Sequence, residues 1–184
     1  DQVVNGNIEA IQSVEKMILD ANVNLDLKMV IRLKLAMENE KSSIAKSVLN
    51  EIIENQDIAR NENIPMCQDT GVAVFFVEIG NEVFLNFNIE DAINEAVRNA
   101  YIKGYLRKSV VRHPLKRENT LDNTPAIIHI VQAMNDYLVI KMAAKGAGSE
   151  NMSAMKMLTP SEGKQGIIDF VLKTIKDAGG RACP

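Results

Sequence analysis

Five adjacent residues of this sequence carry groups that could do chemistry. They provide a soft metal ligand, an amide, a carboxylate, a hydroxyl and a turn-forming glycine, in the order Cys67, Gln68, Asp69, Thr70 and Gly71. A thiolate can bind a metal ion and a carboxylate can transfer a proton, so this combination indicates a site rather than core packing. The only other cysteine, Cys183, follows a pair of glycines near the other end of the sequence. We therefore expect both thiols to lie in loops.

Two further segments carry groups suited to binding an anion or a metal ion, and each follows the expected end of a helix or strand. Residues 107–124 form the first, which begins with Arg107, and residues 145–151 form the second, which contains Gly146 and Gly148. Glycine has no side chain to hinder a bound anion, so backbone amides there can converge on a negative group. The glycine spacing fits neither the dinucleotide-binding nor the phosphate-loop fingerprint, so we do not expect nucleotide binding.

The composition limits the classes of protein that this sequence can represent. With 184 residues, of which 46% are hydrophobic, the chain can fold as one domain, residues 1–184, that buries about 70% of its unfolded surface. The 21 basic and 24 acidic residues include no basic run, so we do not expect nucleic-acid binding. No apolar stretch reaches the roughly 20 residues of a membrane-spanning helix, and we expect a soluble, cytoplasmic protein without membrane contact. Two cysteines alone would also permit a disulfide in an oxidising compartment.

The first third of the sequence predicts three amphipathic helices. Apolar residues recur there at helical spacing, in the sets Ile8, Ile11, Val14 and Ile18; Val30, Leu33 and Met37; and Ile44, Val48 and Ile52. Pro65 ends the helical pattern, because proline has no backbone N–H to donate and restricts the residue before it. The segment at Cys67 should therefore follow the third helix as a loop.

The middle of the sequence predicts a hairpin of two strands. Residues 72–79 form a nearly continuous apolar run, which is typical of a strand covered on both faces. Gly80 and Asn81 fit a two-residue turn that leads into a second strand over residues 82–87.

A helix capped by Asn88 should follow, end near Leu106 and lead into a long loop. Residues 126–132 and 137–142 predict another pair of strands. We therefore expect an α+β fold in which N-terminal amphipathic helices pack with a mixed, largely antiparallel sheet and a C-terminal helix.

The last helix has the clearest predicted boundaries. Thr159 should cap it, Pro160 should occupy its first turn and Glu162 should complete a capping box. Gly179 and Gly180 should end it. Its apolar residues at helical spacing are expected to face inward, namely Ile168, Val171, Leu172 and Ile175.

Five ordered segments closely resemble the alpha subunit, or amino-terminal region, of class I fumarate hydratases. These are the iron–sulfur hydro-lyases that also include L-tartrate dehydratase. The segments are residues 65–71, 105–109 leading to 114–115, 119–125, 145–151 and 182–184. The resemblance covers almost the whole chain, and five segments in the same order are hard to obtain by chance.

The resemblance implies a [4Fe–4S] cluster held by three cysteines, with Cys67 and Cys183 in two of those places. The third cysteine of the family lies further along, so this chain is expected to lack the C-terminal tail of the subunit. The family also implies a beta subunit or C-terminal half, which supplies further arginines, a lysine and a catalytic threonine in an oligomer. The implied function is the alpha half of a hydro-lyase that reversibly hydrates fumarate to (S)-malate.

The chemistry of hydration explains why such residues would be needed. Removing water from malate requires loss of a weakly acidic proton and departure of a hydroxide, and an iron with one open position can act as a Lewis acid. The resemblance places Arg107 against a carboxylate of the C4 dicarboxylate substrate. Gln68 and the amides of Gly146 and Gly148 can bind substrate as well. Asp69 is the acid–base candidate, because the cluster and the substrate anion could raise its proton affinity.

Several of these residues also have simpler explanations. Arg107 and Lys108 at a helix end can complement the helix dipole, and we assign no role to Lys108. Asp69 can simply cap the turn that follows it. We expect His113 to be a loop residue near the site and His129 to be a satisfied core histidine, and neither is expected to bind a metal ion.

Three other functions remain open. The substrate can be L-tartrate or a related hydroxy diacid, although the tartrate enzymes compared carry glycine where this sequence has Gln68, which favours fumarate. The chain can also be a non-catalytic fragment that only docks its beta partner. A zinc site is least favoured, because two cysteines without a nearby pair of histidines give too few ligands.

Overall fold

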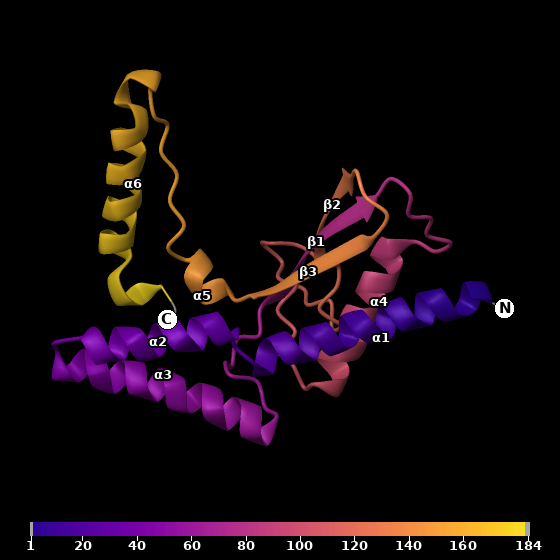
Figure 1. The fold of residues 1–184 in the computed structure, drawn as a ribbon, viewed down its shortest axis with the longest axis horizontal. Coiled ribbons are helices and arrows are strands. Elements are labelled where there is room, and N and C mark those ends of the chain that lie inside the picture. Colours follow the sequence, from indigo (N-terminus) through magenta and orange to yellow (C-terminus); the bar gives the residue numbers. More distant parts are fainter. Residues whose placement is uncertain (1, 183–184) are drawn as a thin grey trace. The chain divides into compact units, whose positions relative to one another are not determined.

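The computed structural model of the protein describes residues 2–182. Its internal contacts divide the chain after Lys145 into two compact units, whose α-helices and strands are labelled in Figure 1. The first unit holds four helices and a three-stranded sheet, and the second holds one long helix and shorter helical turns. The α+β class predicted from the sequence is confirmed. The expectation that residues 1–184 form one domain stays a prediction.

The three helices predicted for the N-terminal third are confirmed. They are α1 (Gln2–Val23), α2 (Leu27–Asn39) and α3 (Ser43–Glu62). The side chain of Asp26 caps α2 by accepting a hydrogen bond from Lys28 N at 2.7 Å. Ser42 caps α3 in the same way, by accepting a hydrogen bond from Ala45 N at 3.3 Å. Asn63 ends α3 in the left-handed conformation, with φ of 54°, so the chain leaves the helix before the cysteine loop.

The sheet has a central strand with a partner on each edge. Its strands are β1 (Val72–Gly80), β2 (Ile127–Ala133) and β3 (Leu138–Lys145), in the order β2–β1–β3. β1 pairs with β2 in parallel and with β3 in antiparallel orientation, so Val77 lies between Ile130 and Ile140. The predicted mixed sheet is confirmed, but only one of its two ladders is antiparallel. β2 and β3 do not pair with each other as expected, because each takes one edge of the apolar strand β1.

The strand expected over residues 82–87 does not form, so the predicted hairpin is wrong. β2 and β3 already occupy both edges of β1, and a hairpin partner would find no edge left to pair with. The chain instead makes a turn, in which Val83 N donates to Gly80 O at 3.0 Å, while Asn81 N donates to Ala133 O at the end of β2 at 2.9 Å.

The core of the first unit lies between one face of the sheet and two helices. α4 (Ile89–Lys103) begins at Asn88 as predicted, because the Asn88 side chain accepts hydrogen bonds from the N–H groups of Glu90 and Asp91. α1 and α4 pack against each other (Figure 1) and bury the same face of β1. The buried side chains of this core include Val14, Ile18, Phe75, Val77, Ile93, Val97 and Tyr101.

The opposite face of β1 is only partly covered, so the prediction of a strand covered on both faces is wrong. Phe76 is 49% exposed on this face. It stacks on His129 of β2, with ring centroids 5.2 Å apart. His129 is therefore an exposed stacking partner and not the core histidine that its apolar neighbours in sequence had suggested.

The second unit consists of helices and one extended segment. Its helices are α5 (Ala147–Glu150), η1 (Pro160–Glu162), α6 (Gly163–Ala178) and η2 (Gly179–Arg181). The predicted capping box is confirmed, since the carboxylate of Glu162 accepts a hydrogen bond from Thr159 N at 2.7 Å. The α6 residues expected to face inward are exposed, so that prediction is wrong for Ile168, Val171, Leu172 and Ile175. The described part of this unit, residues 146–182, is too short to cover both faces of α6.

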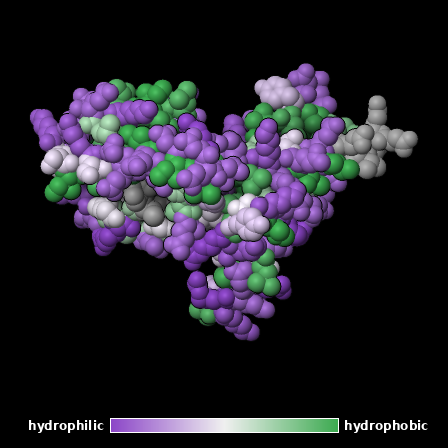
Figure 2. All heavy atoms as spheres, turned by 90° about the horizontal axis from the view of Figure 1, so that it is seen from below, coloured by the Kyte–Doolittle hydropathy of each residue, from purple (hydrophilic) through white to green (hydrophobic). Residues whose placement is uncertain are grey.

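The surface mixes apolar and polar side chains. Figure 2 shows hydrophobic residues in separate patches among hydrophilic ones on one face of the molecule. Exposed apolar residues occur on several helices, for example Leu27 and Ile31 on α2 and Ile44 on α3. Within residues 2–182, no helix combines the length and the apolar character needed to cross a membrane.

Candidate functional site

Two helices anchor the residue that precedes Cys67. Met66 N donates a hydrogen bond to Asn22 O of α1 at 2.9 Å, and Met66 O accepts one from Asn55 Nδ2 of α3 at 2.8 Å. Cys67 itself is exposed, and its thiol forms no disulfide. The first residue of the candidate site is therefore an accessible thiol on a loop whose start is fixed to the helices.

Asp69 shapes the turn that leads from this loop into β1. Its Oδ1 accepts a hydrogen bond from Gly71 N at 3.0 Å. Gly71 has a φ of 65°, a left-handed conformation that glycine adopts without steric cost. The turn-capping role considered for Asp69 is therefore present in the structure. It is compatible with acid–base chemistry, because a carboxylate has two oxygens and can accept several hydrogen bonds.

Thr70 joins the cysteine loop to the segment that carries Arg107. Arg107 N donates a hydrogen bond to Thr70 Oγ1 at 2.9 Å, and Thr70 Oγ1 donates to Arg107 O at 3.3 Å. Thr70 is only 5% exposed, whereas the residue Arg107 is exposed. The two sequence-predicted segments are therefore brought together by a buried hydroxyl, which leaves the guanidinium of Arg107 at the surface.

Replacing Thr70 by valine is expected to lower the free energy of unfolding by about 1–3 kcal/mol, because it leaves two partly buried backbone groups of Arg107 without their partner. Valine has nearly the same shape as threonine, so the loss of packing is small. Urea denaturation of the chain and its variants measures the change. Thr70→Ser keeps the hydroxyl and serves as the control; equal stability of the valine variant and the wild type would contradict the prediction.

Tyr101 binds the end of the same loop through its hydroxyl group. Its hydroxyl donates to Thr70 O at 3.2 Å and to Gly71 O at 3.1 Å. Burial raises the pKa of Tyr101 to about 12, with a hydrogen bond from Asn123 opposing this rise and the charge of Asp69 adding to it. The phenol therefore stays protonated at neutral pH and remains a hydrogen-bond donor.

The loop that precedes β2 is fixed to α4 by two contacts. Arg98 Nε lies 3.2 Å from Asp122 Oδ2, and Asn94 Oδ1 accepts a hydrogen bond from Ala126 N at 2.8 Å. Burial acts to raise the pKa of Asp122, but hydrogen bonds from Thr124 and Arg98 outweigh it and hold this pKa below its usual value. Asp122 is therefore a charged anchor for the loop at neutral pH.

Sequence reasoning missed the role of Asn123, although it singled out residues 119–125 as a segment. Asn123 is completely buried and has a φ of 63°. Its Oδ1 accepts hydrogen bonds from Ser109 N at 2.6 Å and Val110 N at 3.1 Å, and its Nδ2 donates to Gly71 O at 3.1 Å. An asparagine in a loop rich in Asn, Asp and Thr signals a left-handed turn position. It gives no hint of these distant partners.

The remaining predicted site residues are placed as follows. Gln68 is exposed beside Cys67, Gly146 begins the second unit, and Gly148 lies within α5. Cys183 lies outside the described residues. Within residues 2–182, the structure contains no group of three or more His, Cys, Asp or Glu side chains that could hold a metal ion. The assignments of these residues to metal and substrate stay predictions.

His113 is an exposed loop residue, as expected. Its Nδ1 accepts hydrogen bonds from Leu115 N at 3.2 Å and Lys116 N at 3.3 Å. This histidine therefore organises the backbone of its own loop.

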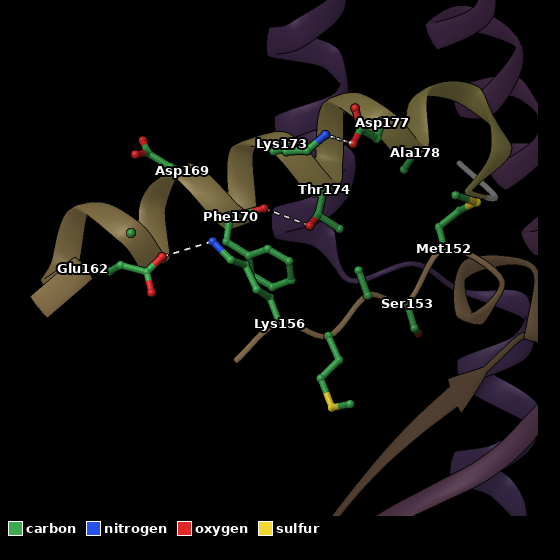
Figure 3. A pocket seen from close by; sticks show the side chains of 13 residues that line it. Met152, Ser153, Lys156, Glu162, Asp169, Phe170, Lys173, Thr174, Asp177 and Ala178 are labelled. Atoms are coloured by element: carbon green, nitrogen blue, oxygen red, sulfur yellow. Dashed lines mark hydrogen bonds and ion pairs between the residues drawn. The ribbon is translucent and has the colours of Figure 1, made fainter. Parts of the chain in front are cut away.

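The second unit contains a cavity of about 540 Å³ beside α6, shown in Figure 3. The extended segment of residues 152–156 and one face of α6 line it. Four of its five charged side chains form ion pairs, Lys156 with Glu162 at 3.1 Å and Lys173 with Asp177 at 2.6 Å, and the fifth, Asp169, accepts a hydrogen bond from Gln165 Nε2 at 2.8 Å. None of the predicted site residues lines this cavity, and its two lysines and three carboxylates give the lining a net negative charge that disfavours a dicarboxylate.

The fold and site define an α+β protein whose candidate site is built on loops around an exposed thiol, a carboxylate and an arginine. Residues 11–184 match the family model described as fumarate hydratase (Fumerase). The chain belongs to this family, which confirms the resemblance inferred from its motifs.

Two curated relatives are tartrate dehydratase subunits. The chain is 45% identical over 159 residues to the putative L(+)-tartrate dehydratase subunit alpha of Methanocaldococcus jannaschii. This alignment covers 83% of this chain and 55% of that protein. The chain is 30% identical over 186 aligned residues to the L(+)-tartrate dehydratase subunit alpha of Escherichia coli (strain K12). This alignment covers 100% of this chain and 60% of that protein. The chain thus spans less than two thirds of the length of these relatives.

Proposed function

We propose that this chain is the cluster-bearing alpha half of a [4Fe–4S] hydro-lyase that reversibly hydrates fumarate to (S)-malate. The observation that carries the proposal is the pair of hydrogen bonds between Thr70 and Arg107, at 2.9 and 3.3 Å, which joins an exposed thiol loop to an exposed arginine. Membership of the fumarate hydratase family supports the reaction class. A beta subunit or C-terminal half completes the active site, the assembly is oligomeric, and its location is the cytoplasm.

The described residues fit one part of the proposed cluster site. Cys67 is an exposed thiol that is free of disulfide bonding, and iron–sulfur clusters are held by cysteine thiolates. In the proposal, Cys67 and Cys183 are two ligands, and a third cysteine comes from outside this chain. When bound, the cluster supplies a Lewis-acidic iron that polarises the hydroxyl of the substrate.

The residues of this chain bind the dicarboxylate and move its proton. The guanidinium of Arg107 donates two parallel hydrogen bonds to one carboxylate, and the amide of Gln68 donates another. The backbone amides of Gly146 and Gly148 bind a carboxylate oxygen. Asp69 takes the proton from the carbon beside a carboxylate during dehydration and returns it during hydration.

Replacing Arg107 by lysine is expected to raise the KM for the dicarboxylate about 10- to 100-fold, because a lysine keeps the charge but cannot form the bidentate pair. The hydrogen bonds to Thr70 use only backbone atoms of Arg107 and are retained. Steady-state kinetics on the complete assembly measures the change. Lys108→Ala is the matched neighbouring control, and an equal rise of KM in that variant would contradict a specific role for Arg107.

L-tartrate is the second candidate substrate. The names of the two relatives favour it, since both are tartrate dehydratase alpha subunits. Gln68 favours fumarate, because the resemblance places glycine at this position in the tartrate enzymes. Turnover of (S)-malate and of L-tartrate by the same enzyme preparation separates the two, and preferential turnover of tartrate would overturn the fumarate assignment.

Anaerobic reconstitution with iron and sulfide tests the proposal as a whole. The full-length subunit with its beta partner is expected to show visible charge-transfer absorbance and to hydrate fumarate, whereas the 184-residue chain alone is expected to show no turnover. If the full-length subunit bound its beta partner but the assembly turned over no diacid, a non-catalytic docking role would be favoured instead.

A further inference from the structure

Asn123 connects three backbone segments of the candidate site through one buried side chain. Its acceptor oxygen binds the amides of Ser109 and Val110, at 2.6 and 3.1 Å, just after Arg107. Its donor nitrogen binds Gly71 O, at 3.1 Å, just after Asp69. Because Asn123 is 0% exposed, these bonds are shielded from competition by water.

We propose that Asn123 is a positioning residue, which sets the distance between the Asp69 turn and the Arg107 segment. This inference rests on the proposed function, in which Asp69 handles the proton and Arg107 binds a carboxylate of the same dicarboxylate. Positioning matters because small displacements of such groups reduce catalysis strongly. Thr70 already links the two segments, and Asn123 adds a second link two and three residues beyond Arg107. Two links restrict rotation of the segment, which a single link cannot do.

Two properties of asparagine suit it to this role. A carboxamide offers a donor and an acceptor at once, which valine, alanine and an ionised aspartate do not. Asparagine also tolerates the left-handed φ of 63° at this position. Tyr101 donates to the same Gly71 O at 3.1 Å, so this carbonyl accepts a hydrogen bond from each of the two side chains, and the bonds from Ser109 and Val110 define the orientation of the carboxamide.

The test compares two substitutions of Asn123 in the complete assembly with its cluster. Asn123→Ala removes both ends of the carboxamide and is expected to raise the KM for the dicarboxylate about tenfold. Asn123→Asp keeps the acceptor for Ser109 and Val110 but places a second oxygen against Gly71 O in a buried position, so it is expected to raise KM at least as much as alanine does. Iron content should change little, because Asn123 is not a proposed cluster ligand, whereas kcat per cluster should fall as KM rises, because Asp69 is no longer held in place relative to the bound dicarboxylate. A residue with a merely structural role would lower the amount of active enzyme and leave KM unchanged, and that result would overturn the proposal.

The matched control is Asn63→Ala. Asn63 is an exposed asparagine with a similar left-handed φ of 54° at the end of α3, so its substitution reports the cost of backbone strain alone. It is expected to leave the KM unchanged. An equal rise of KM in Asn63→Ala and Asn123→Ala would overturn a specific role for the buried carboxamide.

Hydrogen exchange measures the same link without any turnover. The amides of Ser109 and Val110 should exchange at least about tenfold faster in Asn123→Ala than in wild type, because they lose their acceptor. Unchanged exchange would overturn the proposal whatever the kinetics show. If the wild-type assembly turned over no diacid, the proposed function would be rejected. Hydrogen exchange would still test the link made by Asn123, so failure of the proposed function can be distinguished from failure of this inference.

Discussion

Replacing Cys67 by alanine is expected to reduce turnover of the dicarboxylate by the complete assembly on the order of 10³-fold or more. In the proposed function Cys67 is one of three thiolate ligands, and Lewis-acid stabilisation of a departing hydroxide is worth several kcal/mol, or roughly three powers of ten in rate. The fold should tolerate the change, because Cys67 is exposed and the hydrogen bonds that anchor this part of the loop belong to Met66. The loss should therefore appear in the cluster and in turnover while the chain stays folded.

The measurement combines iron and acid-labile sulfide content, visible absorbance and turnover, all on protein prepared without oxygen. Met66→Leu is the matched control, since it changes the preceding side chain in size only slightly and keeps the backbone bonds to Asn22 and Asn55. It is expected to retain cluster and activity. A Cys67→Ala variant with full iron content and full activity would show that Cys67 is not a ligand of the cluster. This result would contradict the proposed function.

Local patterns predicted the elements of this fold, but not how the strands pair. The apolar spacing of Ile8 to Ile18 and the caps at Asn88 and Thr159 describe interactions within a few residues, and the structure confirms these helices and caps. The parallel pairing of β1 with β2 joins segments about fifty residues apart, and no local pattern encodes it. The chain does turn at Gly80, as its turn residues predicted. The following segment forms no strand, because β2 and β3 already pair with both edges of β1.

Apolar periodicity identifies a hydrophobic face, but it does not say what covers that face. The stripe on α6 that includes Val171 and Ile175 follows helical spacing well, and these side chains are exposed in the structure. The run in β1 likewise suggested burial on both sides, whereas Phe76 is covered only in part, by the ring of His129. In each case the pattern depends on the residue types alone, and burial depends on partners elsewhere in the chain.

The residues of the candidate site could be predicted from the sequence, but the bonds that hold them could not. Cys67, Asp69 and Arg107 stand out because their side chains carry chemistry. Thr70 and Asn123 act on residues that are 37 and 52 positions away in the sequence, through one hydroxyl and one carboxamide. Such side chains are common in turns, so only the folded structure shows that these two connect the loops.

Replacing Asp69 by asparagine is expected to lower kcat of the complete assembly about 10²- to 10⁴-fold, with a much smaller change in KM. The structure makes this substitution especially informative. Asp69 Oδ1 accepts the hydrogen bond from Gly71 N at 3.0 Å, and the carboxamide oxygen of asparagine can accept the same bond. Asparagine therefore preserves the turn but removes the ability to take up and release a proton, together with one negative charge.

Two comparisons complete this test of Asp69. Asp69→Ala removes both the proton-transfer group and the turn, so it should lose activity like asparagine and in addition lose about 0.5–1.5 kcal/mol of unfolding free energy. Asp57→Asn, on the exposed surface of α3, controls for the loss of one negative charge and should leave kcat unchanged. If Asp69→Asn kept full kcat while Asp69→Ala lost it, Asp69 would serve only as a turn cap, and the acid–base group would have to come from the beta half of the enzyme.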